Sequence, residues 1–153
     1  MRYFLIVLTM LGLSMTTKAQ SAEDSVKATI NKMFDAMRKA DGEMLKSCFS
    51  DSIVFQTIAR SKEGKMIVRN ESADGFVSQI SKATAGLLDE RITYETIKVD
   101  GPLALAWTPY SFYYNGNFSH CGVNSFQLVR FDGEWKIQYI IDTRRRQGCM
   151  VEQ

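Results

Sequence analysis

The sequence is poor in the residues that build metal and phosphate sites. It contains one histidine, His120, among 153 residues, and its carboxylates are scattered. Zinc centres need a cluster of histidine, cysteine or carboxylate ligands, and the spacing of the three cysteines matches no zinc motif. A glycine-rich phosphate loop is also absent. We therefore expect neither a metal nor another cofactor.

Long apolar runs are also missing, except at the N-terminus. Arg2 precedes the mainly apolar residues 3–13, and a polar stretch follows at residues 14–20. This is the signal-peptide pattern, and the run is too short to span a bilayer. The small residues Thr17 and Ala19 predict cleavage after Ala19, which leaves one domain of residues 20–153. The alternative, a buried N-terminal helix, is disfavoured because the run shows no amphipathic face.

The predicted mature domain has no excess charge of either sign. The whole chain has 19 basic and 17 acidic residues, and residues 1–19 contain Arg2, Lys18 and no acid, so 17 of each remain. Binding to nucleic acid or to anionic lipid needs an excess of basic groups. We therefore expect an exported protein, periplasmic or secreted, that binds neither nucleic acid nor, after cleavage, a membrane.

The three cysteines, Cys48, Cys121 and Cys149, allow at most one intramolecular bridge. Disulfides persist in the compartments that exported proteins reach. Three pairings are possible, and the sequence does not choose among them. The favoured interpretation is one bridge and one buried thiol.

Helical periodicity comes first along the chain and β-strand patterns come last. Asn115-Gly116 and Asp132-Gly133 separate β-rich segments, and such pairs are strong hairpin signals because both residues must take positive φ. The result is an α+β fold in which about three N-terminal helices pack across one face of a curved antiparallel sheet. The predicted helices are 25–40, 43–49 and one capped by Ser72 that runs through Ala83, and the predicted strands are 53–58, 66–69, 91–99, 103–114, 117–131 and 134–145.

Two-residue turns at these hairpins predict which side chains share one face. One end of this face is apolar, and the other end carries polar groups that need partners if buried. We therefore expect helices over the apolar end and a ligand cavity at the polar end. The predicted ligand-binding residues are Trp107, Ser111, Tyr113, Phe118, His120 and Asn124.

The same register places Cys121, Val123, Ile140 and Asp142 on the opposite face, which we expect to form a homodimer. A catalytic pair of His120 and Asp142 is therefore disfavoured. A β-bulge would move one side chain across the sheet and reverse this interpretation.

The element order and the segments 119–124, 135–137 and 142–145 resemble the nuclear transport factor 2-like, SnoaL-like superfamily, in particular its exported lumazine-binding-type members. The resemblance implies a cone-shaped α+β barrel with a pocket between helices and sheet, commonly in a dimer. Isomerase-like members place a carboxylate base near the end of the first strand, where residues 55–58 contain no acid. Cyclase-like members use a histidine and an aspartate of the last strands, which resemble His120 and Asp142.

Three functions remain open. The first is a non-catalytic domain that binds an unidentified small apolar or aromatic molecule, since aromatic faces with few polar groups are typical of ligand sites. The second is a lyase, isomerase or cyclase that uses His120 in general acid–base catalysis. The third is a dimeric structural or interaction module.

Overall fold

Each of the three helices begins at a side chain that caps it. The computed structural model describes residues 21–149, so the predicted signal peptide lies outside the described residues. The side chains of Ser21, Asp41 and Ser72 accept hydrogen bonds from backbone N–H groups of the first helical turns, which would otherwise lack partners. The helices are α1 (Ala22–Lys39), α2 (Gly42–Lys46) and α3 (Ala73–Ser81).

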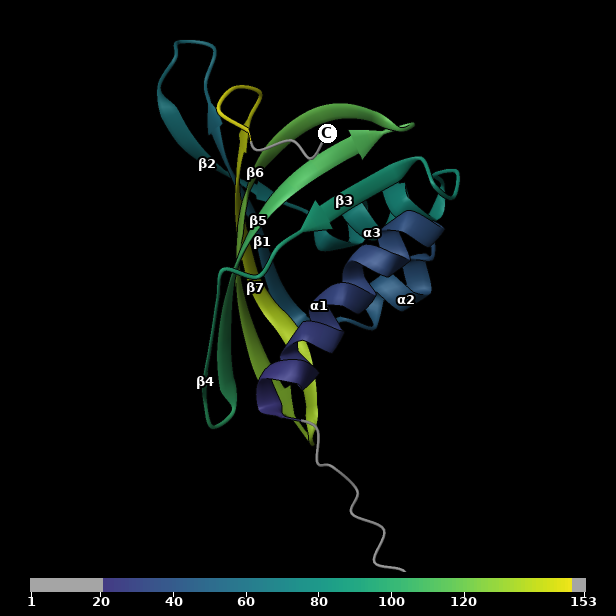
Figure 1. The fold of residues 1–153 in the computed structure, drawn as a ribbon, viewed down its shortest axis with the longest axis vertical. Coiled ribbons are helices and arrows are strands. Elements are labelled where there is room, and N and C mark those ends of the chain that lie inside the picture. Colours follow the sequence, from purple (N-terminus) through teal and green to yellow (C-terminus); the bar gives the residue numbers. More distant parts are fainter. Residues whose placement is uncertain (1–20, 150–153) are drawn as a thin grey trace, which may run out of the picture.

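Seven strands form one curved, unclosed sheet in the order β2-β1-β7-β6-β5-β3, and β4 pairs with another part of β5. The pairing of β1 with β7 is parallel and all the other pairings are antiparallel. The helices cover one face, called the inner face below, and leave the other side of the sheet, the outer face, uncovered (Figure 1). The strands are β1 (Phe49–Arg60), β2 (Met66–Glu71), β3 (Leu88–Ile92), β4 (Thr96–Asp100), β5 (Leu103–Tyr114), β6 (Asn117–Phe131) and β7 (Glu134–Arg145).

The predicted α+β class, the third helix and the last three strands are confirmed, and both hairpins turn where expected. Asn115 and Asp132 have φ of 50° and 47°, and the glycine that follows each also has positive φ. The predicted strand over residues 91–99 is wrong, because β3 and β4 are separate. Opposite the break, Pro109 accepts a hydrogen bond from the Thr93 N–H but has no N–H to return. The ladder is therefore interrupted at this point.

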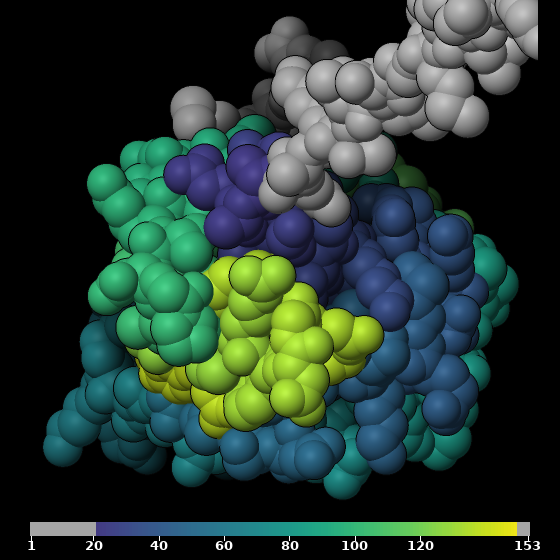
Figure 2. Space-filling model, turned by 90° about the horizontal axis from the view of Figure 1, so that it is seen from below, coloured from purple at the N-terminus to yellow at the C-terminus, as the bar shows by residue number. Residues whose placement is uncertain are grey.

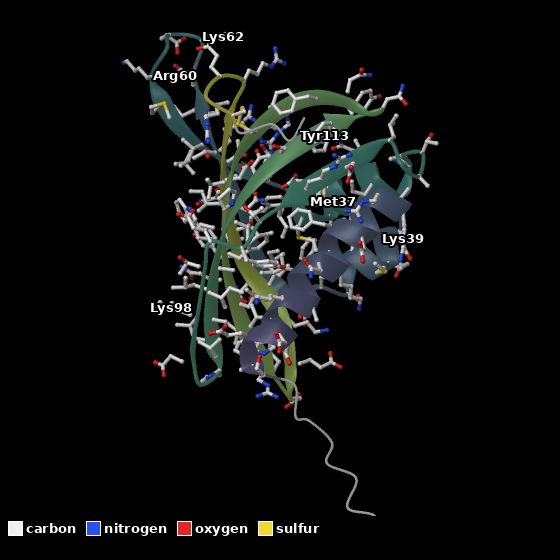
Figure 3. The ribbon with its side chains drawn as sticks, in the orientation of Figure 1. Met37, Lys39, Arg60, Lys62, Lys98 and Tyr113 are labelled. Atoms are coloured by element: carbon white, nitrogen blue, oxygen red, sulfur yellow. A yellow bond between two sulfur atoms is a disulfide. The ribbon has the colours of Figure 1, made fainter. Side chains whose placement is uncertain are left out.

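The core lies between α1 and the inner face of the sheet. Alternation along β5 identifies this face, because Ala104 and Ala106 are 1% exposed whereas Leu103 and Leu105 are 51% and 43% exposed. From α1, Met37 points toward the sheet, while Lys98 on β4 points away from the helices (Figure 3). The most deeply buried side chains of this core are Val26, Ile30, Leu45, Ile80, Phe126, Leu128, Ile137 and Ile140.

The end of the molecule at which α1 begins is filled by packed side chains. Figure 2 shows the start of α1, in purple, crowded against the β4–β5 turn in green and the β6–β7 turn in yellow-green. The Thr29 hydroxyl donates to the carbonyl of Trp135, and the Tyr94 hydroxyl donates to the carbonyl of Lys27. A cavity between helices and sheet therefore has to lie toward the other end of α1.

A β-bulge at Gln138 changes the predicted register of β6 and β7. Leu128 lies opposite Ile137 as expected, but Gln127 lies opposite Tyr139, so Gln138 is an extra residue on β7. The Gln138 side chain accepts from the Ser50 hydroxyl and donates to the Ser52 carbonyl, and these bonds to β1 hold the bulge. Beyond the bulge every side chain of β7 is on the face opposite to the prediction.

A second bulge, at Ser119, shifts β5 against β6. Tyr113 lies opposite Phe118 as predicted, but Phe112 lies opposite His120, so Ser119 is an extra residue on β6. The prediction that Trp107 and Ser111 share a face with His120 and Asn124 is therefore wrong. The bulge at Gln138 by itself places Asp142 and Ile140 on the inner face, where the simple register had placed Thr143 and Ile141.

Cys121 and Cys149 form a disulfide, and Cys48 is a buried free thiol. One of the three possible pairings is thereby selected, in agreement with the interpretation of one bridge and one buried thiol. None of the helices described for residues 21–149 is long and apolar enough to cross a membrane.

Candidate functional site

A cavity of about 580 Å³ lies between α1, α3 and the inner face of the sheet. Its wall combines apolar, aromatic and polar side chains, and Arg69 and Glu71 of β2 are among the charged ones. Met33 and Met37 contribute from α1 and Ile80 from α3. The aromatic lining residues are Phe34, Phe55, Phe76, Tyr110, Phe112, Tyr114 and His120.

At one end of the cavity a carboxyl group is bonded to an amide. Glu90 on β3 accepts a hydrogen bond of 2.8 Å from Nδ2 of Asn124 on β6. Asn124 is 6% exposed. Burial raises the pKa of Glu90 to about 7, and the negative charge of Asp142 acts in the same direction, against the hydrogen bond from Asn124. Glu90 is therefore a carboxyl group that exchanges a proton near neutral pH.

Asp142, by contrast, has several partners. The Thr57 hydroxyl donates to Oδ1, and Nε of Arg144 donates to Oδ2 at 2.8 Å. The hydroxyl of Tyr110 lies 3.5 Å from Oδ2 and donates at 2.9 Å to the carbonyl of Thr143. With 5% of its surface exposed, Asp142 is a buried anion whose charge is balanced by Arg144.

Tyr110 reaches β7 because the residue between them is a glycine. Gly122 lies between Tyr110 and Arg144 in the strand ladder. A Cβ atom at this position would lie 2.7 Å from Cε1 of Tyr110 and 1.8 Å from the carbonyl oxygen of Thr143. The absence of a side chain at Gly122 therefore allows the tyrosine ring to cross β6.

His120 lies in the cavity wall between two aromatic rings. Its ring centroid is 5.8 Å from that of Tyr110 and 4.9 Å from that of Phe112. Nδ1 is 3.1 Å from the hydroxyl oxygen of Ser119. Burial lowers the pKa of His120, and the positive charge of Arg144 adds to this effect. His120 is therefore a neutral imidazole at neutral pH.

The structure brings together only part of the predicted site. His120 and Asn124 line the cavity, and Asp142 lines it as well because of the bulge at Gln138. Trp107 is 44% exposed on the outer face, and Ser111 pairs with Cys121 on the same side.

Tyr113 and Phe118 are also outside the cavity. Their rings pack against each other at 5.9 Å, and the guanidinium of Arg91 lies 4.2 Å from the centre of the Tyr113 ring. These two rings therefore form a separate cluster on the outer face with Arg91.

Sequence reasoning missed Glu90, Tyr110 and Arg144. Glu90 directly precedes the predicted strand over residues 91–99, so no sheet face is predicted for it. Leu88 and Ile92 lie two residues before and after Glu90, and this spacing is the signal that could have placed Glu90 with them on one face of a strand. Tyr110 and Arg144 were assigned to the wrong face, because two-residue turns alone do not reveal bulges.

The site offers proton donors, proton acceptors and aromatic surfaces. Among residues 21–149, no group of three or more histidine, cysteine or acidic side chains is arranged to hold a metal ion. The arrangement is suited to holding a flat organic molecule, with the Glu90–Asn124 pair at one end and aromatic rings along the wall.

Comparison with known proteins identifies the fold. No family model matches this sequence, and no curated protein matches it. Among solved structures, it is similar to an NTF2-like protein of unknown function from Shewanella baltica, with a TM-score of 0.63 and 14% identity over 82% of this chain and 94% of the other. An NTF2-like protein of unknown function from Methylobacillus flagellatus gives a TM-score of 0.61 and 19% identity over 83% and 96% of the two chains.

A third structure, a domain of unknown function with a cystatin-like fold from Nostoc punctiforme, gives a TM-score of 0.63 at 20% identity over 82% of this chain and 78% of the other. At these identities the likeness shows the fold alone. Ligand and activity have to be argued from the side chains of this chain.

Proposed function

We propose that this chain, which has the nuclear transport factor 2-like fold, is a binding domain for a small, largely aromatic molecule. The observation that carries the proposal is the cavity of about 580 Å³, in which aromatic walls from helices and sheet converge on the Glu90–Asn124 pair. Ligand sites typically combine a largely apolar lining with a few polar groups that fix orientation. The size of the cavity is within the range of small-molecule sites.

The test uses the neutral fluorescent dye N-phenyl-1-naphthylamine as the probe. Gln79 and Ser78 are adjacent exposed residues of α3, but only Gln79 lines the cavity. We expect saturable dye binding by the wild type and at least tenfold weaker binding by Gln79→Trp, because the indole fills the entrance. Ser78→Trp is the matched control and should bind as the wild type does. Equal binding by both variants, or no saturable binding at all, contradicts the proposal.

The bulge at Gln138 supports a second candidate, general acid–base catalysis. It places Asp142 in the wall of the same cavity as His120, the two residues that resemble those of the cyclase-like members. A neutral imidazole accepts a proton near neutral pH. To separate catalysis from simple binding, a mixture of small molecules is incubated with the wild type and with His120→Gln. If the protein is an enzyme, the wild type forms products whose amount increases with time, and the variant forms none. Stoichiometric retention of a compound without conversion supports the binding domain.

The outer face of the sheet supports a homodimer as a separate proposal. Leu103, Leu105 and Trp107 are 51%, 43% and 44% exposed on this face, and Val123 is partly exposed beside them. Ile140, which the predicted interface included, lies on the inner face and takes no part. Light scattering at micromolar concentration tests this proposal, with a dimer for the wild type and a monomer for Trp107→Lys as the expected results. A wild-type monomer contradicts it.

A further inference from the structure

The Glu90 carboxyl group has no cationic partner within residues 21–149. None of the ion pairs there includes Glu90. Arg144, whose charge acts on Glu90, is bonded to Asp142. A half-buried carboxylate without a paired cation loses part of its hydration, so the group either binds a proton or attracts a positive charge from elsewhere.

The hydrogen-bonded pair of Glu90 and Asn124 retains two further acceptor atoms. Nδ2 of Asn124 donates to Oε1 of Glu90, and within the described residues this is the one hydrogen bond that either side chain makes. Oε2 of Glu90 and Oδ1 of Asn124 are thus available to a ligand. Two neighbouring acceptors match a planar group with two N–H donors, as in carboxylate–guanidinium pairs.

The walls beside this pair favour a flat cation. Phe112 lies opposite Glu90 in the strand ladder, and His120 lies opposite Phe112. Phe34 and Tyr114 also line the cavity. Aromatic faces attract cations and stack on planar groups. The two arginines of the wall, Arg69 and Arg144, are each paired with an acid, Glu71 and Asp142. The aromatic rings and the Glu90 carboxylate therefore favour the same sign of charge on the ligand.

We propose that the molecule bound in this cavity carries a positively charged planar nitrogen group, an amidinium, a guanidinium or a protonated nitrogen heterocycle, that pairs with the carboxylate of Glu90 beside Asn124. This inference rests on the proposed binding function and specifies the class of ligand.

Binding of such a cation depends on the protonation of Glu90. Because the pKa of Glu90 is about 7, the carboxyl group is mostly protonated at pH 6 and mostly ionised at pH 8. A ligand that stays cationic over this range binds only the ionised form, so its affinity rises about tenfold between pH 6 and pH 8. The titratable and charged groups that line the two cavities beside Glu90 are Asp35 and Arg38 of α1, Arg69 and Glu71 of β2, Arg91 of β3, Tyr110 and Tyr114 of β5, His120 of β6, and Asp142 and Arg144 of β7, and Asp89 of β3 adjoins Glu90 in sequence.

His120 is the neighbour whose titration has to be separated from that of Glu90. Its pKa lies below the ordinary value because of burial, so it is neutral over most of this range. Protonation of His120 would also weaken the binding of a cationic ligand at low pH. Glu90→Gln retains this effect of His120 and removes the effect of the carboxylate. The variant therefore assigns the pH dependence to one of the two groups.

The experiment compares three probes of nearly equal shape, benzamidine, benzamide and benzoate, which are cationic, neutral and anionic between pH 6 and pH 8. Each is titrated into the full-length domain while its backbone and side-chain amide resonances are followed by nuclear magnetic resonance. We expect benzamidine to bind most tightly at pH 8 and to shift the side-chain amide of Asn124. Its affinity should fall about tenfold at pH 6.

Two variants assign the effect to one carboxyl group. Glu90→Gln keeps the shape and should lose about tenfold in benzamidine affinity at pH 8, together with the pH dependence. Glu95→Gln, an equal change of charge at an exposed residue that does not line the cavity, should behave as the wild type.

The outcomes distinguish this inference from the proposed function. If the neutral dye binds but benzamidine binds no better than benzamide or benzoate, the inference is wrong and the binding domain stands. Retention of the pH dependence in Glu90→Gln also overturns the inference. If neither the dye nor any of the three probes binds, both proposals fail.

Discussion

Asn124 on β6 lies directly opposite Asp142 on β7, so the amide that holds Glu90 and the anion that holds Arg144 are neighbours on the inner face of the sheet. One extra residue, Gln138, produces this arrangement. Without the bulge, Asn124 would face Ile141, and the charged network would lie on the outer face. Asp142 and Arg144 therefore line the cavity because of this irregularity of β7.

The stability of the protein should depend on the ionisation of Glu90. The pKa of about 7 in the folded state is above the ordinary value of 4.5. Between these values the folded state binds more protons than the unfolded state, so the free energy of unfolding falls as pH rises from about 4.5 through 7. The free energy of unfolding of Glu90→Gln, taken relative to that of the wild type, should therefore increase by on the order of 3 kcal/mol between pH 4 and pH 8. Urea denaturation at the two pH values measures this gain, and Glu95→Gln should show none.

Two buried threonines should respond in opposite ways to replacement by valine. Within residues 21–149 the buried hydroxyl of Thr108 has no hydrogen-bond partner, whereas that of Thr57 donates to Asp142. Thr108→Val should stabilise the fold by about 1 kcal/mol, and Thr57→Val should destabilise it by about 2 kcal/mol. Chemical denaturation of both variants checks the difference. A loss of stability in Thr108→Val would mean that its hydroxyl has a partner, such as a buried water.

Gly122 should not tolerate even alanine. The added methyl group would lie 1.8 Å from the carbonyl oxygen of Thr143 and would displace the ring of Tyr110. We expect Gly122→Ala to destabilise the protein by about 2 kcal/mol or more. Gly75→Ala in α3 is the control, since its methyl group meets only the Ser72 side chain, at 3.2 Å, and alanine favours the helix. A melting temperature unchanged in Gly122→Ala would show that the strand ladder relaxes at this point.

The disulfide should contribute measurably to stability. Cys121 and Cys149 are separated by 28 residues, and closing a loop of this length in the unfolded chain stabilises the fold by about 3 to 4 kcal/mol. Cys149→Ser should lower the free energy of unfolding by this amount under oxidising conditions. Thiol titration of the wild type should detect Cys48 only after unfolding, because the thiol is buried and burial raises its pKa. A rapidly labelled thiol in the native protein contradicts this assignment.

Export predicts a defined N-terminus. If residues 1–19 are a cleaved signal peptide, the mature protein begins at Gln20. Intact-mass measurement of the exported protein should therefore show the loss of those nineteen residues. Retention of Met1 in the exported product would contradict this prediction.

The order and type of most elements followed from local patterns. The 3.6-residue spacing of Val26, Ile30 and Phe34 predicted α1, and the hairpin dipeptides predicted the bounds of β5, β6 and β7. These signals are local, because a helix face or a turn is specified by residues that are close in the sequence. The bounds of the first strand were less accurate, because β1 (Phe49–Arg60) extends beyond the predicted residues 53–58 at both ends.

The sequence by itself determined the fold class, the two hairpins and the presence of His120 and Asn124 in one wall. Only the tertiary structure decided that Asp142 and Glu90 are their neighbours and that Trp107 and Ser111 are not. The physical reason is that a sheet alternates its faces at every residue, so one extra residue inverts everything beyond it. The Gln138 side chain is held because it accepts from the Ser50 hydroxyl and donates to the Ser52 carbonyl, and these partners come from a strand more than eighty residues away in sequence.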